Sequence, residues 1–213
     1  MTFTPTERTT PHRKRDRVSY ERVTANAIID EALHCHVGFV ADGSVRVLPT
    51  LHARIDDMLY IHGSTGSGPM LAARGGGLPV CVTVTHIDAL VLARSWMHHS
   101  ANYRCVVAHG RAHLVTDADE KWRALAAFVD KVGQGRSDDS RPPTAKELAE
   151  TAVLALHLRE ASVKARVGGV SDDEEDLALP HWAGVVPLRL TPGRPEPDAG
   201  VSVPLPAYLK TGQ

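Results

Sequence analysis

Short runs of alternating apolar and polar residues, separated by turn residues, fill most of this chain. Such period-two runs predict β-strands with one buried face. The Asp42-Gly43 pair between the first two runs is a strong signal for a tight hairpin. The runs that we expect as strands are 37–41, 45–54, 58–62, 80–85, 89–94, 103–115, 153–159, 163–167 and 185–190.

A few segments instead show helical spacing and capping residues. Residues 24–33 predict a helix with Thr24 as N-cap. Asp117-x-x-Glu120 and Thr144-x-x-Glu147 are capping boxes that open a longer and a shorter helix. Many strands with few short helices predict a mainly β protein, a barrel with peripheral helices. We expect a flexible tail (1–17), a single domain (18–190) and a C-terminal extension (191–213).

Composition narrows the classes of partner. The chain has 24 basic and 25 acidic side chains in 213 residues, which argues against binding nucleic acid or a membrane surface through net charge. Its three cysteines are an odd number in apolar surroundings without Cys-x-x-Cys spacing, which favours free thiols in a reducing compartment. With no apolar run of membrane-spanning length, we expect a cytoplasmic protein.

A Gly/Ser-rich turn carries the clearest chemical signal. Leu59-Tyr-Ile-His-Gly-Ser-Thr-Gly-Ser-Gly68 runs from an apolar strand into small residues and then toward a helix near Pro69. Backbone N–H groups and serine hydroxyls that converge in this way can hold a phosphate. The sequence lacks the Gly-Lys-Ser/Thr and Gly-x-Gly-x-x-Gly signatures of nucleotide loops.

Several ordered segments together resemble one family. The hairpin, Tyr-Ile-His-Gly-Ser, Pro79-Val-Cys-Val-Thr-Val and Asn102-Tyr-Arg-Cys-Val-Val-Ala-His-Gly-Arg-Ala are similar to the pyridoxamine phosphate oxidase-like split-barrel flavoproteins, in particular their nitroimidazole-reductase branch. The resemblance covers about 18–167, and 180–187 resembles an extension of actinobacterial members. It implies a six-to-eight-stranded antiparallel split β-barrel. It also implies a homodimer with FMN at the subunit interface, which passes electrons to a small acceptor.

The resemblance and the residue chemistry together give a set of candidate cofactor-binding residues. Pro49 removes one N–H donor and marks a strand edge where a ligand can pair. Arg54, Arg74, Arg94 and Arg104 are candidate counter-charges for the phosphate, since a guanidinium binds phosphate bidentately, and the resemblance favours Arg104. The predicted site residues are Leu48, Pro49, Thr50, His62, Gly63, Ser64, Thr65, Ser67, Thr83, Tyr103 and Arg104.

His62 is the candidate catalytic residue. It matches a histidine close to the flavin ring in the nitroimidazole reductases, where an imidazole can donate a hydrogen bond or a proton near neutral pH. A structural histidine is the alternative interpretation. The predicted function is an FMN-dependent oxidoreductase that takes electrons from a reduced nicotinamide or deazaflavin and reduces a small organic molecule.

Two other hypotheses remain open at this point. Pairs of histidines provide candidate ligands for zinc or haem, and haem has the stronger case because relatives of the split-barrel family include haem-binding proteins. No acidic or thiolate partner has ligand spacing, so no metal site is predicted. The other hypothesis is a flavin-binding or haem-binding protein without catalysis. The histidines considered are His34, His36, His98, His99, His109 and His113.

Overall fold

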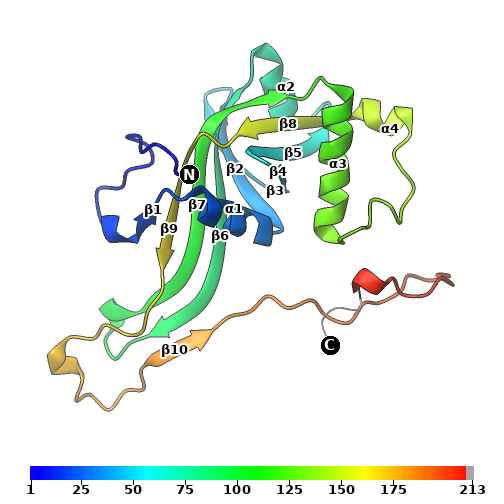
Figure 1. Ribbon diagram of the computed structural model, residues 1–213. Coiled ribbons are helices and arrows are strands. Elements are labelled where there is room, and N and C mark those ends of the chain that lie inside the picture. Colours follow the sequence, from blue (N-terminus) through cyan, green and yellow to red (C-terminus); the bar gives the residue numbers. More distant parts are fainter. Residues whose placement is uncertain (210–213) are drawn as a thin grey trace.

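One antiparallel sheet organises the chain. The computed structural model describes residues 1–209, and within this range ten strands form a sheet whose main path is β3-β2-β6-β7-β8-β5-β4 (Figure 1). Because the two ends of this path do not pair with each other, the barrel is split. The strands are β1 (Val18–Ser19), β2 (His34–Ala41), β3 (Ser44–Leu51), β4 (Ala53–Ile55), β5 (Met58–Ser64), β6 (Leu78–Leu92), β7 (Ser100–Leu114), β8 (Thr151–His157), β9 (Glu160–Arg166) and β10 (Gly184–Pro187).

The expected antiparallel split barrel is therefore confirmed, although the sheet has more strands than the six to eight expected. The excess comes from short strands such as β1, which pairs with β9, and β10, which pairs with β6. The Asp42-Gly43 hairpin between β2 and β3 is also confirmed. Both turn residues have positive φ, 51° and 71°, as this type of two-residue turn requires.

A buried histidine divides a segment that was expected as one strand. Residues 45–54 were predicted to be continuous, but the structure breaks them between β3 and β4 at His52. His52 is fully buried, and its Nε2 donates to the carbonyl oxygen of Ile29 at 2.8 Å. The chain changes partner at this residue, since β3 pairs with β2 up to Leu51 and β4 pairs with β5 from Ala53.

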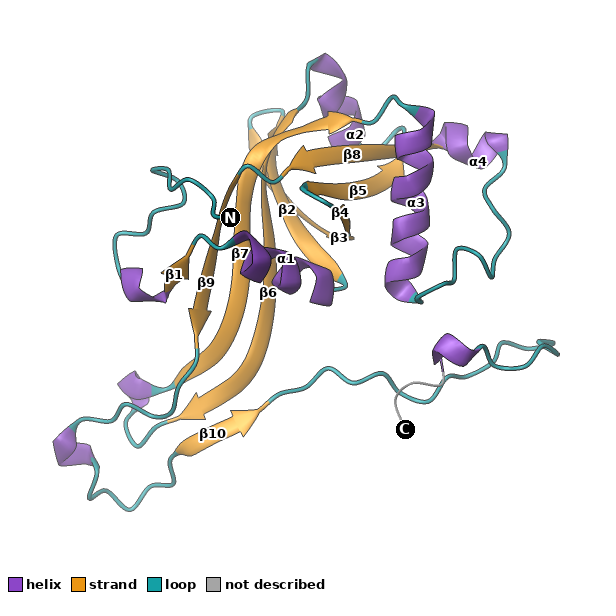
Figure 2. Cartoon of the chain, viewed as in Figure 1, coloured by secondary structure: helices purple, strands orange, loops and turns teal. Residues whose placement is uncertain are grey.

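The two longest strands extend beyond the barrel as an arm. Residues 80–85 and 89–94 were predicted to be separate strands, but they belong to the single strand β6, whose pairing with β7 shifts between Ile87 and Ala89. The irregularity at Asp88 is a bulge, which interrupts the alternation without ending the strand. Figure 2 shows β6 and β7 projecting from the barrel with β10 beside them.

Helices cover the barrel rather than enter the sheet. They are α1 (Arg22–Glu31), α2 (Gly68–Ala72), α3 (Ala118–Val132) and α4 (Ala145–Glu150). Asp117 and Thr144 are confirmed as N-caps, since each side chain accepts from the backbone N–H three residues later. The reciprocal bond of a capping box is recorded at Thr144, whose N–H donates to Glu147, whereas the Glu120 carboxylate accepts from the Tyr60 hydroxyl. Thr24 as N-cap is wrong, because α1 begins two residues earlier and the Thr24 hydroxyl donates to the Glu21 carboxylate instead.

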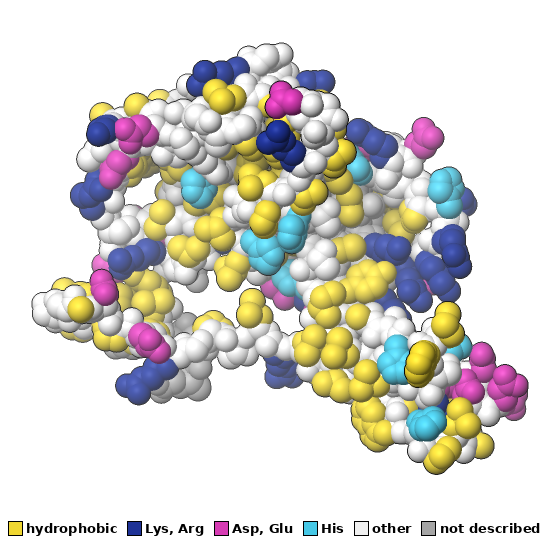
Figure 3. Space-filling view, turned by 180° about the vertical axis from the view of Figure 1, so that it is seen from behind, with side chains coloured by type: hydrophobic (Ala, Val, Ile, Leu, Met, Phe, Trp, Pro, Cys, Tyr) yellow, Lys and Arg dark blue, Asp and Glu magenta, His cyan; other side chains and the backbone are white. Residues whose placement is uncertain are grey.

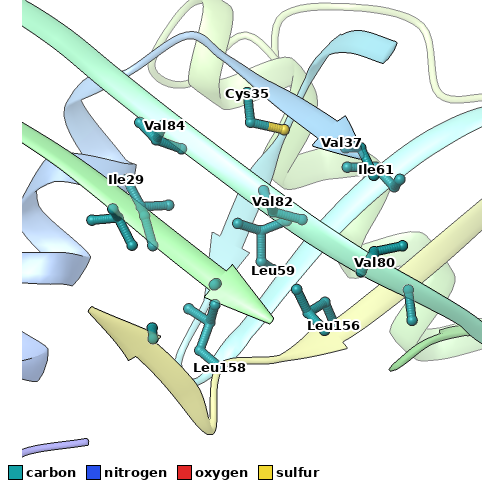
Figure 4. Close-up of a cluster of buried hydrophobic side chains, with 14 of the residues drawn as sticks. Ile29, Cys35, Val37, Leu59, Ile61, Val80, Val82, Val84, Leu156 and Leu158 are labelled. Carbon is teal, nitrogen blue, oxygen red and sulfur yellow. The ribbon is translucent and has the colours of Figure 1, made fainter. Parts of the chain in front are cut away.

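Two clusters of apolar side chains hold the layers together. Leu59 and Ile61 of β5 face the barrel interior, where they join side chains from β2, β6 and β8 (Figure 4). The alternate residue Tyr60 faces α3 and packs with Phe128 in the second cluster. The period-two alternation of β5 therefore sends His62 toward α3 as well.

The ends of the chain differ in their packing. Phe3 and Thr9 are buried, so part of the segment expected as a tail packs on the barrel. Residues 188–205 after β10 are exposed and lack regular secondary structure. Among the described residues, no helix has the length and apolar character needed to cross a membrane.

Candidate functional site

The split in the barrel leaves one strand edge available at the predicted site. In the described part of the chain, β3 pairs only with β2, so the backbone groups on its other edge have no strand partner. Leu48 and Thr50 lie opposite buried residues of β2, whereas Pro49 lies opposite the exposed His36 on the outer face. An unpaired edge of this kind can hydrogen-bond a planar ligand in place of a strand. The structure thus places these three predicted residues where a ligand can reach them.

The Gly/Ser turn is folded tightly onto the end of β5. The backbone N–H of Thr65 donates to the Glu150 carbonyl oxygen at 3.0 Å, and that of Ser67 donates to the Ser64 carbonyl oxygen at 2.9 Å. The N–H of Gly66 donates to the Ser64 hydroxyl oxygen at 3.3 Å. These three amide groups are therefore engaged within the protein. The serine hydroxyls and a nearby cation remain the main candidates for contacts with a phosphate.

Arg74 supplies that cation. Its Nη2 donates to the Thr65 carbonyl oxygen at 3.3 Å, which places the guanidinium over the Gly/Ser turn. The other guanidinium nitrogens have no partner among the described residues. Arg74 was one of four arginines considered from the sequence. The short helical segments after the Gly/Ser turn, α2 and Ala73–Gly75, bring Arg74 back beside that turn.

Gly63 allows the turn to close. A Cβ atom at this position would lie 3.4 Å from both the Met70 Cε and the Ser67 Oγ. A small residue at this position packs directly against Met70 and Ser67. Ser64 and Ser67 are the polar groups beside it.

His62 lies at the junction of β5 and α3. Its ring is half-buried and packs edge-on against Phe128, with 4.4 Å between the ring centroids. Burial lowers the pKa of His62, and its Nδ1 is buried without a hydrogen-bond partner among the described residues. A histidine with a lowered pKa is neutral at pH 7. His62 is therefore suited to a hydrogen bond with a ligand rather than to carrying a charge.

The other predicted residues lie farther along the sheet. Thr83 sits opposite His36 on β2 and Val107 on β7, which puts it on the outer face. Tyr103 and Arg104 follow along β7 in the direction of the arm, three to four residues from Val107 and therefore roughly 10–13 Å away along the strand. Within one chain, Thr83, Tyr103 and Arg104 therefore do not lie beside the Gly/Ser turn.

Arg104 has a full set of partners. Its guanidinium donates to both oxygens of Glu31 at 2.6 and 2.9 Å and to both oxygens of Asp88 at 2.8 and 2.9 Å. The hydrogen bonds to Glu31 and then Asp88 raise the pKa of Arg104. These bonds tie α1 to the bulge of β6. Its role toward a phosphate stays a prediction, and binding one would require breaking these ion pairs.

The histidines considered as metal ligands are spread over several elements. No group of three His, Cys, Asp or Glu side chains in residues 1–209 is placed to hold a metal ion. His34 and His36 lie on the outer face of β2 with 5.4 Å between ring centroids. His109 and His113 line a cavity of about 540 Å³ between β7, β8 and the start of α3. Burial lowers the pKa of His109.

The remaining pair lies at the tip of the arm. His98 belongs to a short turn of helix, Trp96–His98, between β6 and β7. Its Nδ1 donates to the Ser171 carbonyl oxygen, and its Nε2 lies 3.3 Å from an Asp173 carboxylate oxygen. Sequence reasoning missed that residues 171–173 fold back onto this tip, because the contact joins segments more than seventy residues apart.

Comparison with known proteins places the chain in a family. The family model for pyridoxamine 5'-phosphate oxidase matches residues 21–165. None of the curated proteins compared with the chain shows a significant match. The chain is similar to the solved structure of the flavocytochrome Anf3 from Azotobacter vinelandii, with 38% identity, 99% of each chain covered and a TM-score of 0.91.

Two further structures extend this comparison. The FAD and haem binding protein from Mycobacterium smegmatis is 36% identical over 91% of this chain and 95% of its own, with a TM-score of 0.85. A putative 5-nitroimidazole antibiotic resistance protein from Bacteroides thetaiotaomicron is 20% identical over 70% of this chain and 86% of its own, with a TM-score of 0.59, and so shares the fold. The chain belongs to the pyridoxamine 5'-phosphate oxidase family.

Proposed function

We propose that this protein binds a flavin and a haem and moves electrons between them and small molecules. The observation that supports this most is the similarity to a flavocytochrome over 99% of both chains. The family model ends at residue 165, whereas this match also covers residues 171–173, which fold back onto the tip of the arm, and the C-terminal segment that follows them. The match to the FAD and haem binding protein covers 91% of this chain, which is also more than the family model spans.

The flavin would lie between the free edge of β3 and the end of β5 that carries His62 and the Gly/Ser turn. The free edge of β3 at Leu48–Thr50 offers backbone groups to the polar rim of the ring, and the neutral His62 offers a hydrogen bond. Ser64, Ser67 and Arg74 stand where a phosphate would lie, and a guanidinium is a strong phosphate partner. These contacts would be made with the ring and the phosphate that FMN and FAD have in common. FMN was predicted from the sequence, and one relative is named for FAD.

The chain also offers ligands for haem. Haem iron takes one or two side-chain ligands from the protein, most often histidine, so the three-residue clusters needed for zinc are not required. His34, His36 and His99 are exposed imidazoles on the described surface. Apolar side chains accompany them on β3 and at the arm tip, and an apolar wall is what a porphyrin face needs.

When bound, a flavin exchanges electrons in pairs or singly and a haem iron exchanges them singly. The chain's own task is to bind and orient both groups and to exclude water from them. The electron donor is proposed to be a reduced nicotinamide or deazaflavin, and the acceptor a small organic molecule.

We also propose a homodimer with each flavin site at the subunit interface. The edge strand β3 exposes Val45 (80%), Val47 (62%) and Leu51 (40%) on one face. An unpaired, apolar edge strand favours association with another copy. A second subunit on this face would close the open side of the β3 edge and complete the site.

Anaerobic reduction tests the proposed function. A substoichiometric reductant specific for flavin is added to the purified protein, and the flavin and haem bands are followed together. We expect the flavin to bleach first and the haem to be reduced afterwards. A protein in which reduced flavin persists beside fully oxidised haem would contradict a shared electron path, and a protein without either band would contradict the proposal as a whole.

A further inference from the structure

The tip of the arm is held rigidly by the segment that folds over it. Arg94 donates from its backbone N–H and its Nη1 to the two carboxylate oxygens of Asp172, at 3.0 and 2.8 Å, and the Asp172 side chain is 1% exposed. The amide of Asn102 donates to the Gly168 carbonyl oxygen at 2.9 Å. The tip is thus fastened on both sides by specific polar contacts.

This rigid tip nevertheless presents large apolar side chains to solvent. Trp96 is 93% exposed and Met97 is 89% exposed. Figure 3 shows hydrophobic and histidine side chains together on the projecting arm. Trp96 and Met97 are adjacent on this turn and together offer an apolar surface that a ligand can cover.

The histidine beside them has its ring protonation fixed. The Nδ1 of His99 lies 2.9 Å from the Ser95 carbonyl oxygen. Because a carbonyl oxygen can only accept, Nδ1 carries the proton, and the neutral ring presents its lone pair at Nε2. No hydrogen bond engages this Nε2 within residues 1–209. A histidine whose second nitrogen donates to a backbone carbonyl is the usual arrangement for a metal ligand.

Within residues 1–209, the other histidines whose rings bond a backbone carbonyl oxygen are His52, His86 and His98. His86 is mostly buried, and its Nδ1 lies 3.8 Å from a Glu31 carboxylate oxygen. Both ring nitrogens of His98 are engaged, by Ser171 and Asp173. His52 is fully buried, and His62 is half-buried against Phe128 of α3. His34 and His36 are exposed, but neither ring has a backbone acceptor within residues 1–209 that would fix its tautomer.

We propose that His99 is an axial ligand of haem iron at the arm tip, with Trp96 and Met97 packing against the porphyrin. This assignment rests on the proposed function, that the chain binds haem. One imidazole with a free lone pair beside apolar side chains is what haem ligation requires from a protein.

The test is chemical rescue of a ligand variant. His99→Gly removes the imidazole from the exposed tip, and we expect haem uptake to fall by about tenfold or more. Free imidazole should then restore the Soret band of the wild type. The flavin spectrum and the circular dichroism should not change. His12→Gly, at an exposed position in the N-terminal segment, is the matched control and should bind haem as the wild type does.

The outcomes separate the two claims. If the wild type takes up haem and His99→Gly has the same haem spectrum as the wild type, the assignment of His99 is wrong and the proposed function stands. A haem loss in His99→Gly that imidazole does not reverse, in a folded protein, also overturns the assignment. A wild type that takes up no haem overturns the proposed function and the assignment together.

Discussion

The buried His52 makes the stability of this protein depend on acid in a calculable way. Its Nε2 donates to Ile29, so protonation would add an N–H at Nδ1, which is buried with no acceptor among the described residues. The ammonium of Lys131 donates to the same Ile29 carbonyl oxygen at 3.0 Å. Burial, more than this neighbouring charge, lowers the pKa of His52 from 6.5 to about 4.

The direction of the effect follows from which state binds the proton. Above pH 6.5, His52 is neutral in both the folded and the unfolded chain and contributes no pH dependence. Between pH 6.5 and about 4 only the unfolded chain is protonated, so folding stability decreases as the pH falls, by about 1.4 kcal/mol per pH unit. The full loss is about 3 kcal/mol, and it levels off below pH 4, where both states are protonated.

Urea unfolding between pH 4 and 7.5 measures this contribution in the purified protein with its cofactors. His52→Gln keeps an N–H donor for Ile29 but does not titrate, so its stability should fall less steeply with acid than that of the wild type. His12→Gln, at an exposed position, should match the wild type. Equal slopes for His52→Gln and the wild type would refute the reasoning.

Three further predictions concern the cofactor site and the assembly. Ser67→Asp should weaken flavin binding by almost three decades, because a carboxylate about 4 Å from a phosphate costs roughly 4 kcal/mol at an effective dielectric near 20; equal affinities in titrations of two folded proteins would remove the phosphate from this turn. Arg74→Gln should weaken flavin binding by roughly tenfold while Arg104→Gln changes it little, and the reverse order would make Arg104 the phosphate partner. Light scattering should give twice the 23.0 kDa of one chain, and a flavin-loaded monomer would contradict the dimer.

Much of the fold could be predicted because its signals are local. Alternation along the strands and the Asp42-Gly43 turn fixed the hairpin order, and the caps at Asp117 and Thr144 marked two helix starts. The break at His52 could not be predicted. It depends on the carbonyl of Ile29, twenty-three residues away, and the surrounding residues continue a strand pattern.

The candidate site, like the fold, could be predicted where its residues are neighbours in the sequence. His62 and the Gly/Ser turn are contiguous in sequence, so their proximity needed no tertiary information. The partners of Arg104 lie 73 and 16 residues away, at Glu31 and Asp88, and nothing near Arg104 in the sequence announces them. The contact between His99 Nδ1 and the Ser95 carbonyl oxygen, which leaves Nε2 free, likewise depends on how the chain turns at the tip. Strand periodicity does not describe that turn.

The bound groups themselves decide whether this chain is a flavin and haem protein. The purified protein is split into two portions, one for acid extraction and chromatography of flavins and one for a pyridine haemochrome assay. Stoichiometric FMN or FAD together with haem in the same preparation is the expected result. Flavin without haem, even after haem is supplied, would contradict the two-cofactor proposal, and the absence of both after both are supplied would contradict any role for this split barrel in electron transfer.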